Sequence, residues 1–436
     1  MVHAKNKVIK NYLNLLLSLY EKDTWDHLNP CDVLLARHDN DCGYVFHDRA
    51  YAQIIDSFGE LCESQGLIIG SIAIPFSRYV GKKATYSSRS CNRAFFIYSV
   101  LGKLLSLIIG KADAKRWSDN QITKFWSRIL ECGKPRIVIG IQPDKNLCKA
   151  CKNKKIPVFD IQHGVFSEND EYYGADYHKH VDISKIPDGF LCWDDDSAEI
   201  IKKWAYIENI PIYIIGNLWF QRFLNPRMND ILVNEAKSAI LDSQLSHPRI
   251  LLSLQGGLSD KYPDIPNNIM SPSLEKVIMD TLDKYSWRIR FHPIQLYGDE
   301  RQYAISYLNA TFGKEKTLKW IQESQIALPI ILQNTDLHIT SHSSVVTEAA
   351  WMGIRSGILS ERVRDGEKYN DLFLREQETG LAEIIPNDSE SIQQWISITL
   401  NKSKGETTFH NYQENLNQFI EKLSAMAQKN KNSINR

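Results

Sequence analysis

Short runs of almost continuous apolar residues recur along this 436-residue chain and constrain its fold more than any other feature. A strand with one solvated face alternates apolar and polar residues, whereas a strand buried on both faces reads as an unbroken apolar run. Helical segments separate the runs, and this alternation predicts parallel sheets covered by helices. In the first half of the chain we expect helices at 13–20 and 51–62 and strands at 32–36, 67–74, 136–141, 156–161, 189–193 and 213–215.

A second set of apolar runs begins after Gly216 and Asn217, beyond a polar helical stretch at about 222–248. Two βα-repeating halves of similar size predict an α/β fold in which two Rossmann-like domains face each other across a cleft. The strands of the second half are expected at 249–254, 288–291, 337–340 and 356–359. The predicted ranges are an N-terminal domain at 1–220, a C-terminal domain at 221–404, and a helix with a frayed tail at 405–436.

The composition is that of a large globular protein, with 43% hydrophobic and 24% charged residues. The chain has 52 basic and 52 acidic residues, so it has no net positive charge that would indicate a nucleic-acid partner. The apolar runs at 13–20 and 101–109 are too short to span a bilayer, and the second contains Lys103. We therefore expect a cytoplasmic protein, for which peripheral contact with the inner face of the membrane stays open.

The cysteines and acidic clusters indicate no metal site. All eight cysteines precede residue 193 without forming a compact disulfide framework, which favours a reducing compartment. Cys148 and Cys151 form a single CxxC, and no second CxxC or histidine pair accompanies it. The run Asp194-Asp195-Asp196 is explained as well by an acidic helix N-terminus as by a metal. We expect neither a metal ion nor a cofactor.

A hydroxyl-rich turn follows the strand predicted at 337–340 and contains Ser341, Ser343 and Ser344. The helix after it contains Glu348, which lies four residues beyond Ser344 and so shares a helical face with it. A strand, a serine turn and a helix N-terminus together can bind an anion such as a phosphate. The alternative is a serine that merely caps an ordinary helix.

Two histidines lie at the carboxyl ends of predicted strands, where open α/β sheets bind ligands. His292 follows the strand that alternates Trp287, Ile289 and Phe291, and a proline ends that strand. His163 follows the strand at 156–161 and precedes Gly164, which permits a tight exit. Each histidine alone could equally be a structural residue.

Three motifs, taken together and in this order, resemble those of bacterial surface-polysaccharide glycosyltransferases of the GT-B type. They are a strand that ends in Gln-His-Gly, a strand that ends in Arg-x-His-Pro, and the turn Ser-x-Ser-Ser-x-x-x-Glu-Ala. The resemblance covers roughly residues 130–385. The His-Pro and Ser-Ser elements are similar to those of bacterial sialyltransferases and Kdo transferases, which use CMP-activated sugar acids. The resemblance implies that the element containing Arg290 and His292 holds the CMP phosphate together with Ser343 and Ser344.

Glu348 would hold a ribose hydroxyl, as a glutamate in this region does in many GT-B enzymes. Three further residues are placed where a nucleotide could approach the backbone: Gln255 and Gly256 after the first strand of the second domain, and Gly216 at the hinge. A plain tight turn explains the Gln255-Gly256 loop equally well. The loop from Arg37 to Asp41 could meet an acceptor, although a polar loop is the simpler interpretation.

The sequence does not identify the catalytic group. The sialyltransferases carry their catalytic acid in an acidic-acidic-Gly motif, which this chain lacks; its nearest match is Asp188-Gly189. His163 is the first candidate for the base that takes the acceptor proton, since an ordinary imidazole is substantially neutral near pH 7. Rival carboxylates follow it in the chain. They are Glu168, Asp170 and Glu171, and one of them or Asp194 would be the nucleophile of a retaining mechanism.

Three functions agree with these residues. The favoured one is transfer of a CMP-activated 2-keto sugar acid (Kdo, sialic acid or a related nonulosonic acid) onto a capsule or lipopolysaccharide glycan, with a nucleotide-sugar donor and a glycan or glycolipid acceptor as partners. The second is a teichoic-acid-like glycerol or ribitol phosphotransferase with a CDP donor, which these motifs also resemble. The third is a non-catalytic subunit that binds a nucleotide or a glycan.

Overall fold

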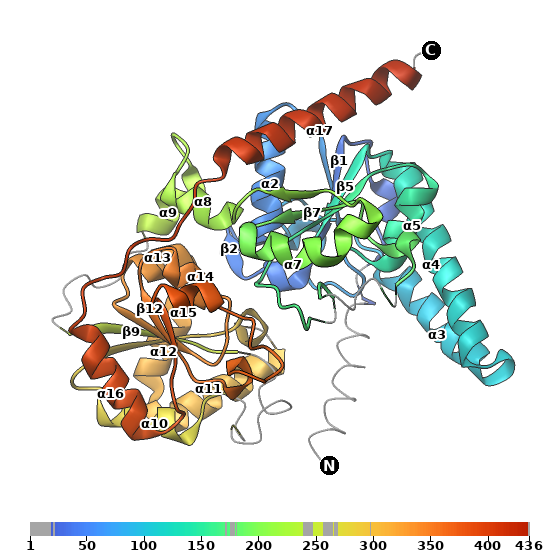
Figure 1. Cartoon of the computed structure of the whole chain (residues 1–436). Helices are drawn as coiled ribbons and strands as arrows, with labels where there is room; N and C mark the ends of the chain where they lie inside the picture. Colours follow the sequence, from blue (N-terminus) through green and yellow to red (C-terminus); the bar gives the residue numbers. More distant parts are fainter. Residues whose placement is uncertain are drawn as a thin grey trace. The chain divides into compact units, whose positions relative to one another are not determined.

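The computed structural model describes residues 19–20, 22–170, 172–174, 179, 181–238, 247–255, 265, 269–296 and 298–434. The chain forms two compact units, and each is described by itself (Figure 1). Unit 1 comprises Met1–His163, Ala175–Trp219 and Tyr412–Arg436, and unit 2 comprises Gly164–Gly174 and Phe220–Asn411. These units differ from the predicted ranges in two segments, because 164–174 belongs to unit 2 and the C-terminal helix belongs to unit 1.

Unit 1 is built on a parallel sheet of six strands in the order β4-β1-β5-β6-β7-β8. Each of the six strands predicted in this half is present, and five of them are almost wholly buried apolar runs. The exception is β8, an edge strand that is only half-buried. The strands are β1 Val33–Arg37, β4 Ile69–Ala73, β5 Ile137–Gly140, β6 Val158–Ile161, β7 Gly189–Cys192 and β8 Ile212–Ile214. A small antiparallel pair, β2 Tyr44–Phe46 and β3 Arg49–Tyr51, was not expected from the sequence.

Aromatic and cysteine side chains fill the core between this sheet and its helices. Phe125 and Trp126 of α4 pack with Cys148 and Cys151 of α5, so the CxxC is a buried apolar element. Phe419 of the C-terminal helix packs on Phe159 and Tyr213, which attaches that helix to unit 1. The helices are α2 Gln53–Ser64, α3 Asn92–Ile109, α4 Lys111–Gly133, α5 Lys145–Asn153, α7 Asp195–Ala205 and α17 Gln413–Ile434, with short 3-10 turns η1 Trp25–His27, η2 Asp39–Asp41, η3 Gly81–Lys83, η4 Ile183–Lys185 and η5 Tyr206–Glu208.

Unit 2 is built on a parallel sheet of five strands in the order β10-β9-β11-β12-β13. The four strands predicted here are present, and β13 is additional. They are β9 Arg249–Ser253, β10 Ser286–Arg290, β11 Leu337–Thr340, β12 Arg355–Ile358 and β13 Ala382–Ile384. The helices are α9 Ile231–Ser238, α10 Pro272–Asp280, α11 Gly298–Phe312, α12 Lys314–Ser324, α13 Leu328–Gln333, α14 Val345–Ala350, α15 Leu374–Glu378 and α16 Ser389–Leu400. Two short 3-10 turns are η6 Pro293–Leu296 and η7 Glu361–Val363. Helix α8, Leu218–Leu224, begins in unit 1 and ends in unit 2.

Helices cover both faces of the unit 2 sheet (Figure 1). Trp287, Ile289 and Phe291 belong to the large apolar core, as their alternation predicted. In Figure 1, α10 and α16 lie on one side of this sheet and α13 and α14 on the other. Among the side chains of the strands is the buried His338, whose ring nitrogens lie 2.9 Å from Ser356 Oγ and 3.1 Å from Ser253 Oγ. Burial lowers the pKa of His338 to about 3, so this imidazole is a neutral structural group.

Candidate functional site

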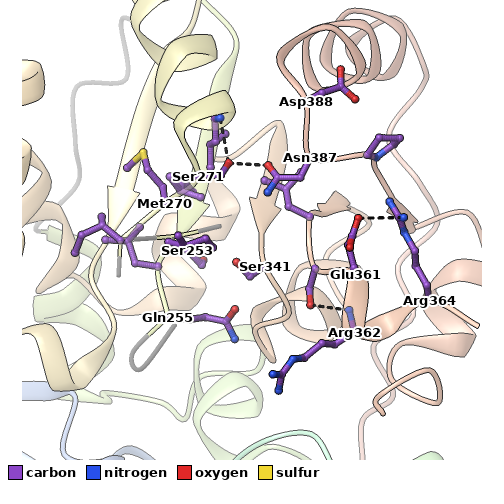
Figure 2. A pocket seen from close by; sticks show the side chains of 18 of the residues that line it. Ser253, Gln255, Met270, Ser271, Ser341, Glu361, Arg362, Arg364, Asn387 and Asp388 are labelled. Atoms are coloured by element: carbon purple, nitrogen blue, oxygen red, sulfur yellow. Dashed lines mark hydrogen bonds and ion pairs between the residues drawn. The ribbon is translucent and has the colours of Figure 1, made fainter. Parts of the chain in front are cut away.

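A cavity of about 640 Å³ lies in unit 2 at the carboxyl ends of its strands (Figure 2). Ligand pockets typically have this size, and open α/β sheets bind their ligands at this edge. Residues from the ends of β9, β11, β12 and β13 and from the start of α10 line the cavity. The polar lining residues include Ser253, Gln255, Ser271, Ser341, Glu361, Arg362, Arg364 and Asn387.

The start of α10 and the loop after β13 are joined at the cavity wall. Ser271 caps α10, since its Oγ accepts a hydrogen bond of 3.2 Å from the N–H of Leu274. The same hydroxyl lies 2.6 Å from Asn387 Oδ1 and donates to it, as Figure 2 shows. Because its partner fixes the Asn387 oxygen, the amide nitrogen of Asn387 can donate to a ligand.

Charged residues of the loop after β12 form another part of the wall. Glu361 Oε1 lies 3.3 Å from Arg364 Nη1, and both residues are visible at the cavity in Figure 2. Arg362 lies between them in the chain, and its N–H donates to Ser360 Oγ at 3.3 Å. The lining also includes Glu367 and Asp388, so two guanidinium groups and three carboxylates share this wall. The guanidinium groups can donate paired hydrogen bonds to a phosphorylated ligand.

Gln255 lines the cavity and also ties three strand ends together. Its Oε1 accepts a hydrogen bond of 2.8 Å from the N–H of His342, in the serine turn after β11. Its carbonyl accepts from Gln295 Nε2 at 3.4 Å, and Gln295 Oε1 accepts from the N–H of His292 at 2.9 Å. Gln255 therefore holds the serine turn and the His-Pro element in register. Gly256 lies outside the described residues.

The serine turn does not form the ordinary helix cap. Ser344 is the N-cap residue of α14, but its side chain makes no cap hydrogen bond. Ser343 Oγ accepts only a long hydrogen bond, 3.4 Å, from the N–H of Val345. Within the part of the chain that the structure describes, the N–H groups of Ser343 and Ser344 donate no backbone hydrogen bond. Of the turn, Ser341 lines the cavity, whereas Ser343 and Ser344 do not.

Glu348 is a buried carboxyl on α14, only 8% exposed. Burial raises the pKa of Glu348 to about 8, although Arg290 opposes the shift. Burial likewise lowers the pKa of Arg290 to about 10, and Arg290 Nη1 donates to the carbonyl of Ile326 at 2.9 Å. No hydrogen bond to the Glu348 carboxyl comes from the described residues. A buried polar group without a partner is costly, so a ligand that donates to Glu348 would be favoured.

His163 lies at the carboxyl edge of the unit 1 sheet, directly beside His38. The rings of these residues, which follow β6 and β1, are 6.2 Å apart between centroids. Burial, with a smaller contribution from the nearby His38, lowers the pKa of His163 to about 4. Its Nδ1 is buried and makes no hydrogen bond to the described residues. The imidazole is therefore neutral near pH 7 and can accept a proton.

From the sequence, His38 was noted only as part of the loop from Arg37 to Asp41, for which a polar loop was the simpler interpretation. Its Nδ1 accepts a hydrogen bond of 3.1 Å from the N–H of Asn40, and burial lowers its pKa while Asp39 opposes this. The rest of the loop is structural. Arg37 pairs with buried Asp56 at 2.7 Å, and Asp41 accepts from the N–H groups of Ile54 and Ile55 at the start of α2.

Of the carboxylates proposed as rivals of His163, Glu171 lies outside the described residues. Glu168 and Asp170 belong to unit 2, where Asp170 Oδ1 accepts from the N–H of Tyr172 at 2.6 Å. Asp194 caps α7, accepting from the N–H of Ser197 at 2.9 Å. Gly216 follows β8 with a φ of 76°, a left-handed conformation that favours glycine. The residues that the structure describes contain no cluster of three metal-ligating side chains.

No protein-family model matches the chain, and no curated protein sequence matches it. Solved structures match its fold at low sequence identity. The UDP-GlcNAc 2-epimerase of Methanocaldococcus jannaschii, in complex with UDP-GlcNAc and UDP, aligns with a TM-score of 0.51 and 15% identity over 90% of this chain and 99% of that one. Another UDP-N-acetylglucosamine 2-epimerase aligns with a TM-score of 0.50 and 12% identity over 91% and 96%. The fold of two parallel α/β domains is therefore that of GT-B enzymes.

Proposed function

We propose that this protein is a glycosyltransferase that moves a CMP-activated 2-keto sugar acid (Kdo, sialic acid or a related nonulosonic acid) onto a capsule or lipopolysaccharide glycan. The observation that carries the proposal is the cavity at the carboxyl ends of the unit 2 strands. It has the volume for a nucleotide sugar, two arginines in its wall that can donate to a phosphate and, tied to it through Gln255, the serine turn. The resemblance of the His-Pro and Ser-Ser elements to CMP-sugar transferases supports the choice of nucleotide.

The phosphate of the donor is assigned to the serine turn and the His-Pro element. The N–H and hydroxyl groups of Ser343 and Ser344 are available as donors, and an anion would satisfy them. Burial lowers the pKa of His292 to about 4, so this neutral imidazole donates a hydrogen bond without carrying charge. We assign the ribose hydroxyls to Glu348, whose carboxyl is buried and accepts no hydrogen bond from the described residues.

The chemical step needs a base for the acceptor and stabilisation for the leaving nucleotide. The acceptor hydroxyl oxygen forms a bond to the anomeric carbon of the sugar acid, and its proton passes to the neutral His163 ring. The bond between the anomeric carbon and the CMP phosphate oxygen breaks, and its electron pair leaves with CMP. The donors of the serine turn stabilise the negative charge that develops on the phosphate.

The donor and the reaction class can be tested together. The purified protein is incubated with a panel of CMP-, CDP- and UDP-activated donors in excess EDTA, and released nucleotide and products are identified by mass spectrometry. We expect CMP release with formation of a glycoside, and we expect it to persist in EDTA because protein hydrogen bonds rather than Mg²⁺ hold the phosphate.

Each other outcome contradicts a specific part of the proposal. A phosphodiester product would indicate a CDP-glycerol or CDP-ribitol phosphotransferase, and conversion of UDP-GlcNAc without an acceptor would indicate an epimerase. Loss of transfer in EDTA, restored by Mg²⁺, would redirect attention to Asp194–Asp196. No nucleotide release from any donor, with binding retained, would indicate a non-catalytic subunit.

The donor residues are tested by CMP affinity. His292→Ala and the double variant Ser343→Ala/Ser344→Ala should each weaken CMP binding by roughly 1.5–3 kcal/mol, because each removes a hydrogen bond to the charged phosphate. Glu348→Ala should weaken it by about 0.5–1.5 kcal/mol, because a ribose hydroxyl loses its partner. Isothermal titration calorimetry measures this directly. Glu378→Ala, on the exposed side of α15, is the matched control and should bind like the natural protein. Unchanged affinity in all three variants would remove the assignment.

A further inference from the structure

Helix α3 of unit 1 carries an apolar stripe that points outward. Its members recur at spacings of three and four residues, which places them on one face of the helix. Leu107 is 83% exposed, Ile108 79% and Leu104 54%, whereas such a stripe ordinarily faces a protein core. The full stripe is Ile97, Val100, Leu101, Leu104, Leu107 and Ile108.

The base of α3 is firmly attached to unit 1. Phe95 packs on Phe125 and Trp126 of α4, with ring centroids 5.5 and 5.4 Å apart. Gly102 allows close approach of the two helices, because a Cβ there would lie 3.2 Å from Ser118 Cβ. Figure 1 shows α3 and α4 as a hairpin whose tip projects beyond the other helices of unit 1. The exposed stripe is therefore held rigidly by packing at its other end.

Positive charge surrounds the apolar tip of the hairpin. From residue 101 to 117 the chain has four basic residues and one acidic residue, although the whole chain is neutral. The acidic residue, Asp113, is already paired with Arg116 at 2.5 Å. Lys103, Lys111 and Lys115 are exposed beside the stripe. An apolar face rimmed by cations is complementary to a bilayer with anionic headgroups.

The charges also distinguish a membrane from a second copy of this chain. An isologous dimer would place this basic tip against itself, which is electrostatically unfavourable. Helix α3 does not cross the bilayer. By its length and its mean hydropathy of 1.4, Asn92–Ile109 could span a membrane, whereas the shorter run 101–109 that the sequence suggested could not. However, its first turns are packed against α4, and α4 returns with several charged residues, which a hydrocarbon core would not accept.

We propose that the tip of the α3–α4 hairpin inserts into the surface of an anionic phospholipid bilayer. The aliphatic side chains of the stripe enter the boundary of the acyl chains, and the lysines contact the headgroups. This surface is separate from the unit 2 cavity, and its function does not depend on the reaction proposed above. It would hold the enzyme where lipid-linked acceptors are found.

Co-sedimentation of the full chain with vesicles tests the proposal. The protein should bind vesicles that contain phosphatidylcholine and phosphatidylglycerol, and should bind phosphatidylcholine alone far more weakly. The variant Leu104→Ser/Leu107→Ser/Ile108→Ser should lose at least about tenfold in binding, since interfacial affinity scales with buried apolar area. In the variant Lys111→Gln/Lys115→Gln, vesicle binding should weaken roughly fivefold for each lysine at low salt, and by less as the salt concentration is raised.

The matched control removes three exposed apolar residues from unit 2. Its substitutions are Met279→Ser, Leu318→Ser and Ile398→Ser, and it should bind vesicles like the natural protein. Circular dichroism confirms that each variant folds. Failure of the natural protein to bind mixed vesicles would overturn the proposal, as would an equal loss in the control. A dimer in sedimentation equilibrium that the Leu104/Leu107/Ile108 variant dissociates, without vesicle binding, would assign the stripe to a second copy.

Discussion

Replacing His163 by alanine should lower turnover by about 10²–10⁴-fold, the usual contribution of a general base. CMP affinity should barely change, because the residues assigned to the donor belong to unit 2. Steady-state kinetics and calorimetry on the same preparation separate the two effects. His27→Ala, at an exposed histidine of unit 1, is the matched control and should keep full activity.

The pH profile distinguishes a base from a structural histidine. Because burial lowers the pKa of His163 to about 4, the ring is neutral above that pH, and activity should fall only as the pH approaches about 4. An ordinary imidazole would give an acid limb near pH 6.5. His38→Ala should move the acid limb upward, since the repulsion from His38 contributes to the lowered pKa.

Three results would contradict the role of His163. Normal turnover in His163→Ala would place the base elsewhere, and Glu168, Asp170 and Glu171 would be tested next. Loss of CMP binding would instead make His163 a donor ligand. A variant with reduced thermal stability and a modest, uniform loss of activity would indicate a purely structural histidine.

Asp56→Ala should lower the free energy of unfolding by about 3–5 kcal/mol, because it leaves a buried arginine without its counterion. The side chains of Arg37 and Asp56 are 2% and 0% exposed. Arg37 also donates to Ser88 Oγ at 3.1 Å and to the carbonyl of Ala50 at 3.0 Å. The group is therefore the polar link between β1, β3 and the start of α2.

Urea denaturation monitored by circular dichroism measures this loss. Glu199→Ala breaks the exposed pair with Lys202 and is the control, with an expected loss below about 1 kcal/mol. If Asp56→Ala does not fold, the double variant Arg37→Met/Asp56→Leu should recover part of the stability, because it removes both buried charges. A loss in Asp56→Ala as small as that of the control would show that the pair is solvated.

Some residues of the candidate site could be predicted because the sequence immediately around them carries a signal. His292 and Ser344 were predicted because each follows an apolar run; in the structure His292 lies two residues beyond β10 and Ser344 is the N-cap of α14. Gln255 was identified in the same way and lines the cavity. Asn387 and Arg364 were not, because an asparagine or arginine in a loop carries no local signal of a ligand.

By itself the sequence determined the ten strands that were predicted, because burial of one or both faces leaves its mark on each run independently. Only the tertiary structure decided which strand ends become neighbours. His38 and His163 are far apart in the chain, and β5 separates their strands in the sheet, yet their rings lie 6.2 Å apart. Strand order and loop packing depend on contacts between distant segments. The same contacts decided that the apolar stripe of α3 faces outward, since its pattern is identical to that of a buried helix.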